Sequence, residues 1–120
     1  MIDHVRLHVT NYDAAKEFYT KALKPLGYSM LMEFGTSGGF GTNAKPDLWL
    51  TKSDTIVPTH VAIVSPDRKS VDAFYDAALA AGGKDNGKPG LRTDYHPNYY
   101  SAFVHDLEGN NIEAVTHKPE

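Results

Sequence analysis

The stretch HVRLHVTNYDAAKEFYTKALKPLG, residues 4–27, recurs 56 positions later as HVAIVSPDRKSVDAFYDAALAAGG, residues 60–83. The two copies align without a gap, and both begin with a histidine. Two copies are too few for a solenoid, which needs at least three units to bury a continuous core. The repeat therefore predicts one domain over residues 1–120, built from a pseudo-symmetric pair of modules at 1–56 and 57–120.

Composition excludes several classes of protein. The chain has 120 residues, of which 41% are hydrophobic and 22% charged, as is usual for one soluble globular domain. Its net charge is −3 and it has no basic cluster, which argues against nucleic-acid binding. It lacks cysteine, so disulfides, thiolate catalysis and cysteine zinc sites are excluded. We expect no signal peptide, no membrane contact and a cytoplasmic location.

Alternating residues predict a strand over residues 2–9, in which His4, Arg6 and His8 share the face opposite Val5, Leu7 and Val9. A helix should follow, capped by Asn11. Its apolar stripe has helical spacing and needs the valine and leucine face as its partner. The members of this stripe are Ala15, Phe18, Tyr19, Ala22 and Leu23.

The second copy has the same pattern. Val61 and Ile63 should pack beneath a helix that opens at Ser65-Pro66, with Ser65 as its cap. Short strands are expected after each helix, near residues 28–34, 39–42, 47–52, 83–87, 99–105 and 110–116. Each module then has the order βαβββ, and the fold class is α+β, with curved sheets around a cleft. We interpret the glycine-rich segment 35–41 as a flexible hairpin that could act as a lid.

Three side chains could form a metal site. On the last strand, Ile112 and Ala114 suit the side covered by a helix, so Glu113 should share the opposite side with His4 and His60. Two histidines and one carboxylate form a facial triad, which holds a divalent metal and leaves positions open for substrate. Ligand type alone admits iron, manganese, nickel, cobalt or zinc. A degenerate site that binds organic ligands without metal is the alternative.

The chain resembles the vicinal oxygen chelate superfamily, which includes glyoxalase I, bleomycin-resistance proteins and extradiol dioxygenases. The resemblance covers the whole chain: both modules, the DHV opening, the helices with FYTKAL and FYDAAL, and the closing DLEGNNIEAV. Members of the family typically end with an Asp-Pro-Asp-Gly-Asn turn followed by a metal-binding glutamate. The corresponding turn here is residues 106–110, and the glutamate is Glu113.

The resemblance implies metal ligands at His4, Trp49, His60 and Glu113. An indole carries only an N–H donor and cannot ligate a metal, so Trp49 departs from the glyoxalase I pattern. The remaining set resembles that of extradiol dioxygenases and fosfomycin-resistance transferases. We therefore expect a metal-dependent enzyme that chelates vicinal oxygens of a small molecule. The alternatives are a metal-free, bleomycin-resistance-type binding protein and, less favoured, a lactoylglutathione lyase-type isomerase.

Further residues are candidates for contact with the substrate. Trp49 could form a stacking wall or belong to the core, and Arg6 could bind an anionic group or form a structural ion pair. His8 is too far along the strand to share a metal with His4, so we place it in the cavity or an interface. Tyr99 or His96 could serve as acid or base, or could simply pack in a loop.

We expect a homodimer. In single-chain relatives, sites often form between modules of two subunits, so His4 of one chain could join His60 and Glu113 of another. The sequence leaves open whether the site lies within one chain or is shared. The expected partner of either arrangement is a small-molecule substrate.

Overall fold

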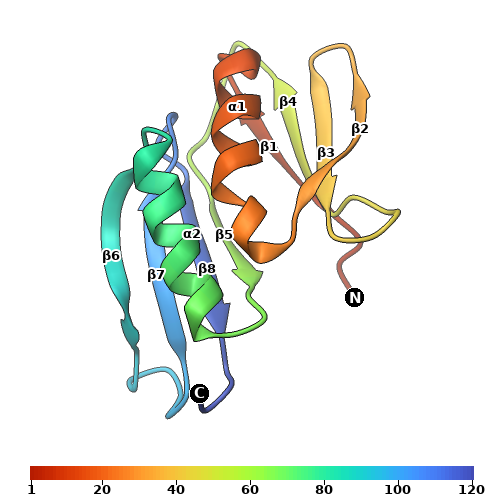
Figure 1. Ribbon diagram of the computed structural model, residues 1–120. Coiled ribbons are helices and arrows are strands. Elements are labelled where there is room, and N and C mark those ends of the chain that lie inside the picture. The colour runs from red at the N-terminus through yellow and green to blue at the C-terminus, as the bar shows by residue number, and fades with distance from the viewer.

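The computed structural model describes residues 1–120, and two similar halves follow one another along the chain (Figure 1). Each half contains four strands and one longer helix, as predicted. The elements of the first half are β1 (Val5–Val9), α1 (Tyr12–Ala22), β2 (Ser29–Phe34), β3 (Ser37–Gly41) and β4 (Leu48–Lys52). Those of the second are β5 (His60–Val64), α2 (Arg68–Ala80), β6 (Lys84–Leu91), β7 (Tyr100–His105) and β8 (Asn111–Thr116).

Helix α1 begins and ends where its sequence indicates. Asn11 has an extended backbone, and its side-chain oxygen accepts a 3.1 Å hydrogen bond from the Ala14 amide, which caps the helix. A short 3₁₀ turn over Lys24–Leu26 follows. Gly27, at φ +84°, then reverses the chain in a conformation that side chains other than glycine rarely adopt.

Helix α2 begins later than predicted. Asp67, rather than Ser65, is its N-cap, and the Asp67 carboxylate accepts a 2.8 Å hydrogen bond from the Ser70 amide. The Ser65 hydroxyl instead donates to the Asp67 carbonyl at 3.1 Å. The carboxylate is well placed because a negative charge at a helix N-terminus also interacts favourably with the helix dipole.

The strands form two separate four-stranded sheets, in the orders β1-β4-β3-β2 and β5-β8-β7-β6. In each sheet the first strand pairs in parallel with the last, and the other pairs are antiparallel. Strands β1 and β5 are therefore edge strands, and no closed barrel forms. The matching topologies confirm the α+β fold class.

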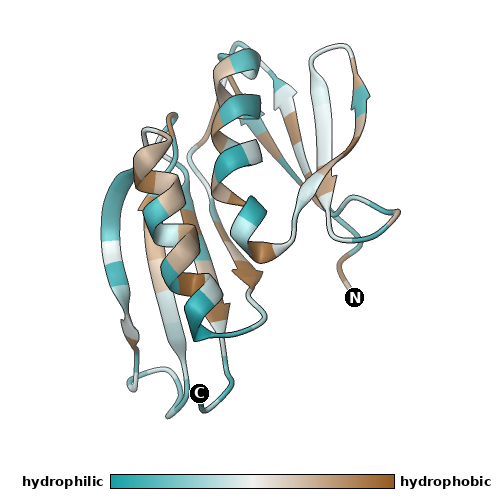
Figure 2. Cartoon of the chain, viewed as in Figure 1, coloured by the Kyte–Doolittle hydropathy of each residue, from teal (hydrophilic) through white to brown (hydrophobic).

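Both helices lie on the same side of the molecule, each covering one face of its own sheet (Figure 1). Hydrophobic residues gather on the strands behind the helices, whereas the outer turns of α1 are hydrophilic (Figure 2). The predicted stripes are buried, including Phe18 and Tyr19 of α1 and Phe74 of α2. One buried cluster joins residues of both halves, so the helices share a core.

The glycine-rich segment forms the turn and second strand of the β2–β3 hairpin, so the predicted hairpin is confirmed, and a role as a lid stays a prediction. Its central residues form β3, which lies in the interior of the first sheet between β4 and β2. A Cβ on Gly38 would lie 2.5 Å from the Tyr12 hydroxyl, and one on Gly39 would lie 2.9 Å from the Trp49 ring. The glycines therefore allow large side chains on both faces to pack against the backbone of β3.

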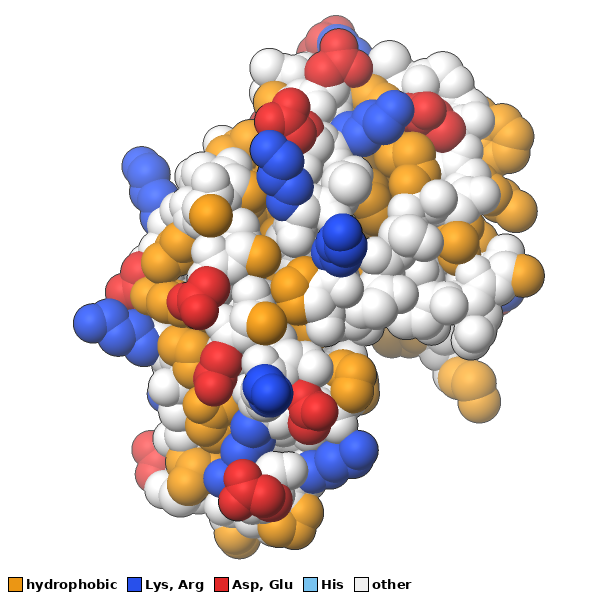
Figure 3. All heavy atoms as spheres, viewed as in Figure 1, with side chains coloured by type: hydrophobic (Ala, Val, Ile, Leu, Met, Phe, Trp, Pro, Cys, Tyr) orange, Lys and Arg blue, Asp and Glu red, His pale blue; other side chains and the backbone are white.

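Charges of both signs are interspersed over the helix side of the molecule (Figure 3). No helix in the structure combines the length and the apolar character needed to cross a lipid bilayer.

Candidate functional site

The faces of the two sheets that the helices leave uncovered carry several of the predicted site residues. In β1, Leu7 and Val9 are buried against α1, whereas Arg6 and His8 are exposed on the opposite face. The alternation is therefore confirmed from Val5 to Val9, but the strand begins at Val5 rather than at residue 2, so His4 lies before it. We call the uncovered faces the first and second open faces, with Arg6 on the first and His60 on the second.

The second open face brings His60 and Glu113 together. Strands β5 and β8 run parallel, with Ala62 opposite Glu113 in the register, so Glu113 lies beside the strand that begins at His60. Oε1 of Glu113 is 2.9 Å from Nε2 of His60. The glutamate side chain is only 2% exposed, while the imidazole is 50% exposed. A buried carboxylate thus sits beneath a ring that reaches the surface.

Tyr99 completes the surroundings of this carboxylate. Its hydroxyl donates a hydrogen bond to Oε2 of Glu113, so both carboxylate oxygens have partners. Burial, reinforced by the hydrogen bond to Glu113 and by the nearby negative charge, raises the pKa of Tyr99 to about 12. At neutral pH the hydroxyl is therefore protonated and can donate, which suits the predicted role of Tyr99 as an acid better than that of a base.

An aromatic cluster surrounds Tyr99 on the other side. The Tyr99 ring packs edge-on against Tyr95 and against His117, with ring centroids 5.1 and 5.0 Å apart. His96 contacts His117 rather than the carboxylate, and Nδ1 of His96 accepts a 3.1 Å hydrogen bond from the Asn98 amide. The structure therefore places Tyr99 beside Glu113, and His96 one side chain further away, at the surface.

His4 does not join His60 and Glu113 within the chain. Its ring lies just before β1, where Nδ1 is 2.6 Å from Oδ1 of Asp3, and Asp3 also pairs with Lys45. No group of three histidine or carboxylate side chains in the chain is arranged to hold a metal. Two of the three predicted ligands are thus brought together by the fold of one chain, and the third is separate.

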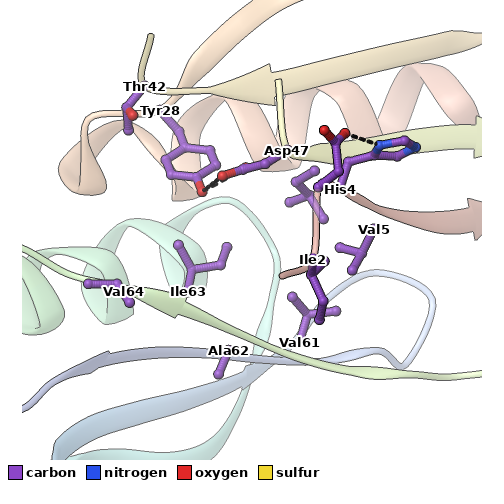
Figure 4. Close-up of a pocket in the computed structure, with 12 residues that line it drawn as sticks. Ile2, His4, Val5, Tyr28, Thr42, Asp47, Val61, Ala62, Ile63 and Val64 are labelled. Atoms are coloured by element: carbon purple, nitrogen blue, oxygen red, sulfur yellow. Dashed lines mark hydrogen bonds and ion pairs between the residues drawn. The ribbon is translucent and has the colours of Figure 1, made fainter. Parts of the chain in front are cut away.

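A crevice of about 630 Å³ lies between the edge strands β1 and β5 (Figure 4). His4 lies at one end of it, and the Tyr28 hydroxyl donates to the Asp47 carboxylate on its upper wall (Figure 4). Its lower wall is apolar and consists of the residues of β5 from Val61 to Val64. Neither His60 nor Glu113 lines this crevice, so it is distinct from their site.

Trp49 and Arg6 meet on the first open face. They are opposite each other in the parallel β1–β4 pair, and the Arg6 guanidinium lies 5.5 Å from the centroid of the indole. Trp49 is half-buried and Arg6 is exposed, and Arg6 forms no ion pair within the chain. His8 lies on the same face, opposite Thr51.

Two aromatic residues on the open faces were not expected from the sequence. Phe34 stacks near Trp49 with ring centroids 6.2 Å apart, and Phe103 lies 6.1 Å from the His60 ring. Phe103 could have been found, because the turn between β7 and β8 sets a register that places it opposite Glu113. The position of Phe34 could not have been predicted, because an irregularity between Met30 and Met32 shifts the alternation of side chains along β2.

Residues 1–114 match the model of the glyoxalase/bleomycin resistance protein/dioxygenase superfamily. The chain belongs to this superfamily. The resemblance noted in the sequence is thus confirmed for the family as a whole. A search of curated proteins finds no match to the chain.

Solved structures share the superfamily fold. A glyoxalase/bleomycin resistance protein from Albidiferax ferrireducens T118 is 23% identical, with a TM-score of 0.84, and the alignment covers 94% of this chain and 96% of that one. A lactoylglutathione lyase from Agrobacterium tumefaciens is 20% identical, with a TM-score of 0.70 and coverages of 96% and 92%. TioX from Micromonospora sp. ML1 is 18% identical, with a TM-score of 0.73 and coverages of 98% and 99%.

Superfamily members commonly use a divalent metal, and the donors present can be tested for fit. Two ligands about 2.1 Å from a metal and at right angles to each other lie about 3 Å apart. The 2.9 Å between Nε2 of His60 and Oε1 of Glu113 matches this separation. The pair therefore fits two adjacent positions around a metal, and a further donor must come from outside this pair.

Proposed function

We propose that this protein is a metal-dependent enzyme of small-molecule metabolism. Its metal is held by His60 and Glu113 of one chain together with His4 of a second copy of the chain. The observation that carries the proposal is the buried Glu113 carboxylate beneath the half-exposed His60 imidazole, with 2.9 Å between their facing atoms. A homodimer is part of this proposal, because one chain brings only two of the three ligands together.

The environment of Glu113 supports this role. A buried carboxylate is costly unless it has hydrogen-bonding or charged partners, and Glu113 has only His60 and Tyr99. The salt-bridge partner, His60, carries a charge only when its ring is protonated. A divalent cation would supply a positive charge to this carboxylate whatever the protonation state of the ring.

The chain's own residues have distinct tasks in such a site. Tyr99 holds Glu113 in a fixed orientation through Oε2 and leaves Oε1 directed at His60. Because its hydroxyl stays protonated at neutral pH, Tyr99 is also the candidate proton donor. When bound, the metal would act as a Lewis acid toward vicinal oxygens of the substrate.

A metal-free binding protein is the second candidate. The supporting observation is the exposed aromatic surface of Phe34 beside Trp49, which could hold an organic ligand without a metal. A lactoylglutathione lyase-type isomerase stays a weaker prediction. Turnover of the hemithioacetal of methylglyoxal and glutathione would support it, and a rate equal to background would exclude it.

Elemental analysis of tag-free protein purified without chelators tests the first candidate. We expect near-stoichiometric metal in the wild type and in a His105→Ala control, and its loss in His60→Ala and in His4→Ala. A mixed dimer of the His4→Ala and His60→Ala chains should regain about half of the metal, because one of its two shared sites carries neither substitution. Absence of metal from the wild type even after reconstitution would contradict the proposal and favour the binding protein.

A further inference from the structure

The first open face carries a guanidinium whose charge is unmatched. Nη1 of Arg6 donates to Oγ1 of Thr51 at 2.5 Å and to Oγ of Ser37 at 3.2 Å. Both acceptors are neutral hydroxyls, and no carboxylate pairs with Arg6. Nη1 has two N–H groups, so both are used within the chain. Nη2 and Nε are left without an acceptor, and together they form the side of the fork that matches a carboxylate.

One aromatic ring adjoins this guanidinium, and a second ring is stacked near the first. The centroid of the Trp49 indole lies 5.5 Å from the guanidinium, and the centroids of Trp49 and Phe34 are 6.2 Å apart, with their ring planes tilted by 15°. Phe34 is 68% exposed. The backbone of Gly39 supports the indole from below, because a Cβ there would lie only 2.9 Å from two of its carbons. The two rings thus form an apolar surface whose indole lies on the backbone of β3 and beside a cation.

We propose that Arg6, Trp49 and Phe34 bind a planar aromatic carboxylate, whose ring stacks on the two aromatic side chains and whose carboxylate accepts hydrogen bonds from Nη2 and Nε of Arg6. This inference rests on the proposed small-molecule function and names the substrate class, but it requires no metal. A carboxylate suits this site because its two coplanar oxygens match the two parallel N–H donors, and one guanidinium balances its single negative charge.

The second sheet does not repeat this arrangement. The residue that corresponds to Arg6 in the repeat is Ala62. Arg92 does lie over Phe103, with 5.4 Å between its guanidinium and the ring centroid, but its Nη2 already donates to the Lys88 carbonyl. The first open face therefore differs from the second in that its arginine donates only to hydroxyl groups and lies beside two stacked aromatic rings.

The test follows the side-chain N–H signal of Trp49 by NMR, which is unambiguous because the chain has one tryptophan. The full-length protein is titrated with 2-naphthoate and with 2-naphthamide, which has the same ring but no charge. We expect saturable binding of the acid at least ten-fold tighter than that of the amide. Equal affinities, or no saturable shift up to about 10 mM, would overturn the inference.

Matched variants assign the contacts. Arg6→Gln should weaken 2-naphthoate binding at least ten-fold, to the level of the amide, whereas Lys16→Gln removes a cation on α1 and should change nothing. Phe34→Ala tests the stacking surface without removing the reporter. Because Arg6 and Phe34 are exposed, both variants should fold, and circular dichroism checks this. Unchanged binding in Arg6→Gln would contradict the assignment.

Failure of this inference is distinguishable from failure of the proposed function. The titration is carried out on protein as purified and again after treatment with EDTA, alongside the elemental analysis. Binding of 2-naphthoate by metal-free wild type, with no metal retained on reconstitution, would support the carboxylate site and contradict the metal enzyme. A protein that retains metal but does not bind 2-naphthoate would contradict the carboxylate site and leave the metal-enzyme proposal standing.

Discussion

The hydroxyl of Tyr19 on α1 donates a buried 2.5 Å hydrogen bond to Oδ2 of Asp106, in the turn between β7 and β8. This bond joins side chains 87 positions apart, one from each module. Asp106 also accepts hydrogen bonds from the amides of Glu108 and Asn110 and from the Asn110 side chain. The turn is therefore built around the same carboxylate that fixes it to the first module.

Tyr19→Phe should lower the free energy of unfolding by about 1.5–3 kcal/mol, because it removes a buried donor from a carboxylate acceptor. Urea denaturation measures the loss. Tyr100→Phe is the matched control. The Tyr100 hydroxyl donates a 2.6 Å hydrogen bond to Asp72, and this bond lies at the surface within the second module. We expect Tyr100→Phe to lower the free energy of unfolding by about 1 kcal/mol or less. Equal losses in the two variants would contradict the prediction that the buried hydrogen bond between the modules stabilises the fold more than the surface one.

Glu108 fixes the same turn to the start of α1. Its Oε2 accepts from the amides of Thr10 and Asn11 at 2.6 and 3.0 Å, and its Oε1 accepts from the Thr10 hydroxyl at 2.8 Å. Glu108→Ala should cost about 1 kcal/mol, as the loss of a helix cap does. Glu17→Ala, which removes only an exposed pair with Lys21, should cost about 0.5 kcal/mol or less. Thermal unfolding compares them, and a larger loss in Glu17→Ala would contradict the prediction.

Gly39→Ala should displace the Trp49 indole, because the new methyl group would lie 2.9 Å from the ring and from the Pro46 side chain. We expect a shift in tryptophan emission and a loss of about 1–3 kcal/mol in unfolding free energy, typical of overpacking. Gly90→Ala is the control, since its Cβ would meet only the flexible end of Arg92 at 3.4 Å and a carbonyl at 4.0 Å. Unchanged emission in Gly39→Ala would contradict the packing described.

Tyr99 should make stability depend on pH in the alkaline range. Its pKa in the folded protein, about 12, is above the ordinary tyrosine value of 10.0, so the unfolded chain loses this proton first. The stability that the group contributes is present below pH 10 and is lost as pH rises through 12. The stability difference between wild type and Tyr99→Phe, from urea denaturation, should therefore narrow across this window. A constant difference would contradict the assigned hydrogen bond to Glu113.

Local patterns in the sequence predicted much of the fold. The apolar spacing in α1 and α2 identified the buried helix faces, and the alternation in β1 identified the exposed side of Arg6 and His8. These features depend on neighbours within a few residues, so they can be read directly. The N-cap of the second helix could not be predicted from the sequence, because Ser65 and Asp67 are both good caps. Only the path of the backbone selects Asp67.

Part of the candidate site was also predictable. Parity along β8 placed Glu113 on the side opposite Ile112 and Ala114, and the structure brings Glu113 to His60. The glycine-rich segment was predicted as a hairpin, and residues 35–41 do form the turn and second strand of one. Its role in β3 depends on Tyr12 and Trp49, which pack against it from elsewhere in the chain.

The sequence by itself determined the two βαβββ units, the faces that their helices cover and the side of each strand that carries the histidines. These follow from periodicity and from an internal repeat. Only the tertiary structure decided that His60 meets Glu113 while His4 stays apart beside Asp3, and that Arg6 lies over Trp49 without an acidic partner. The physical reason is that such contacts depend on strand register and on how separate sheets are oriented, which residue spacing along one chain does not specify.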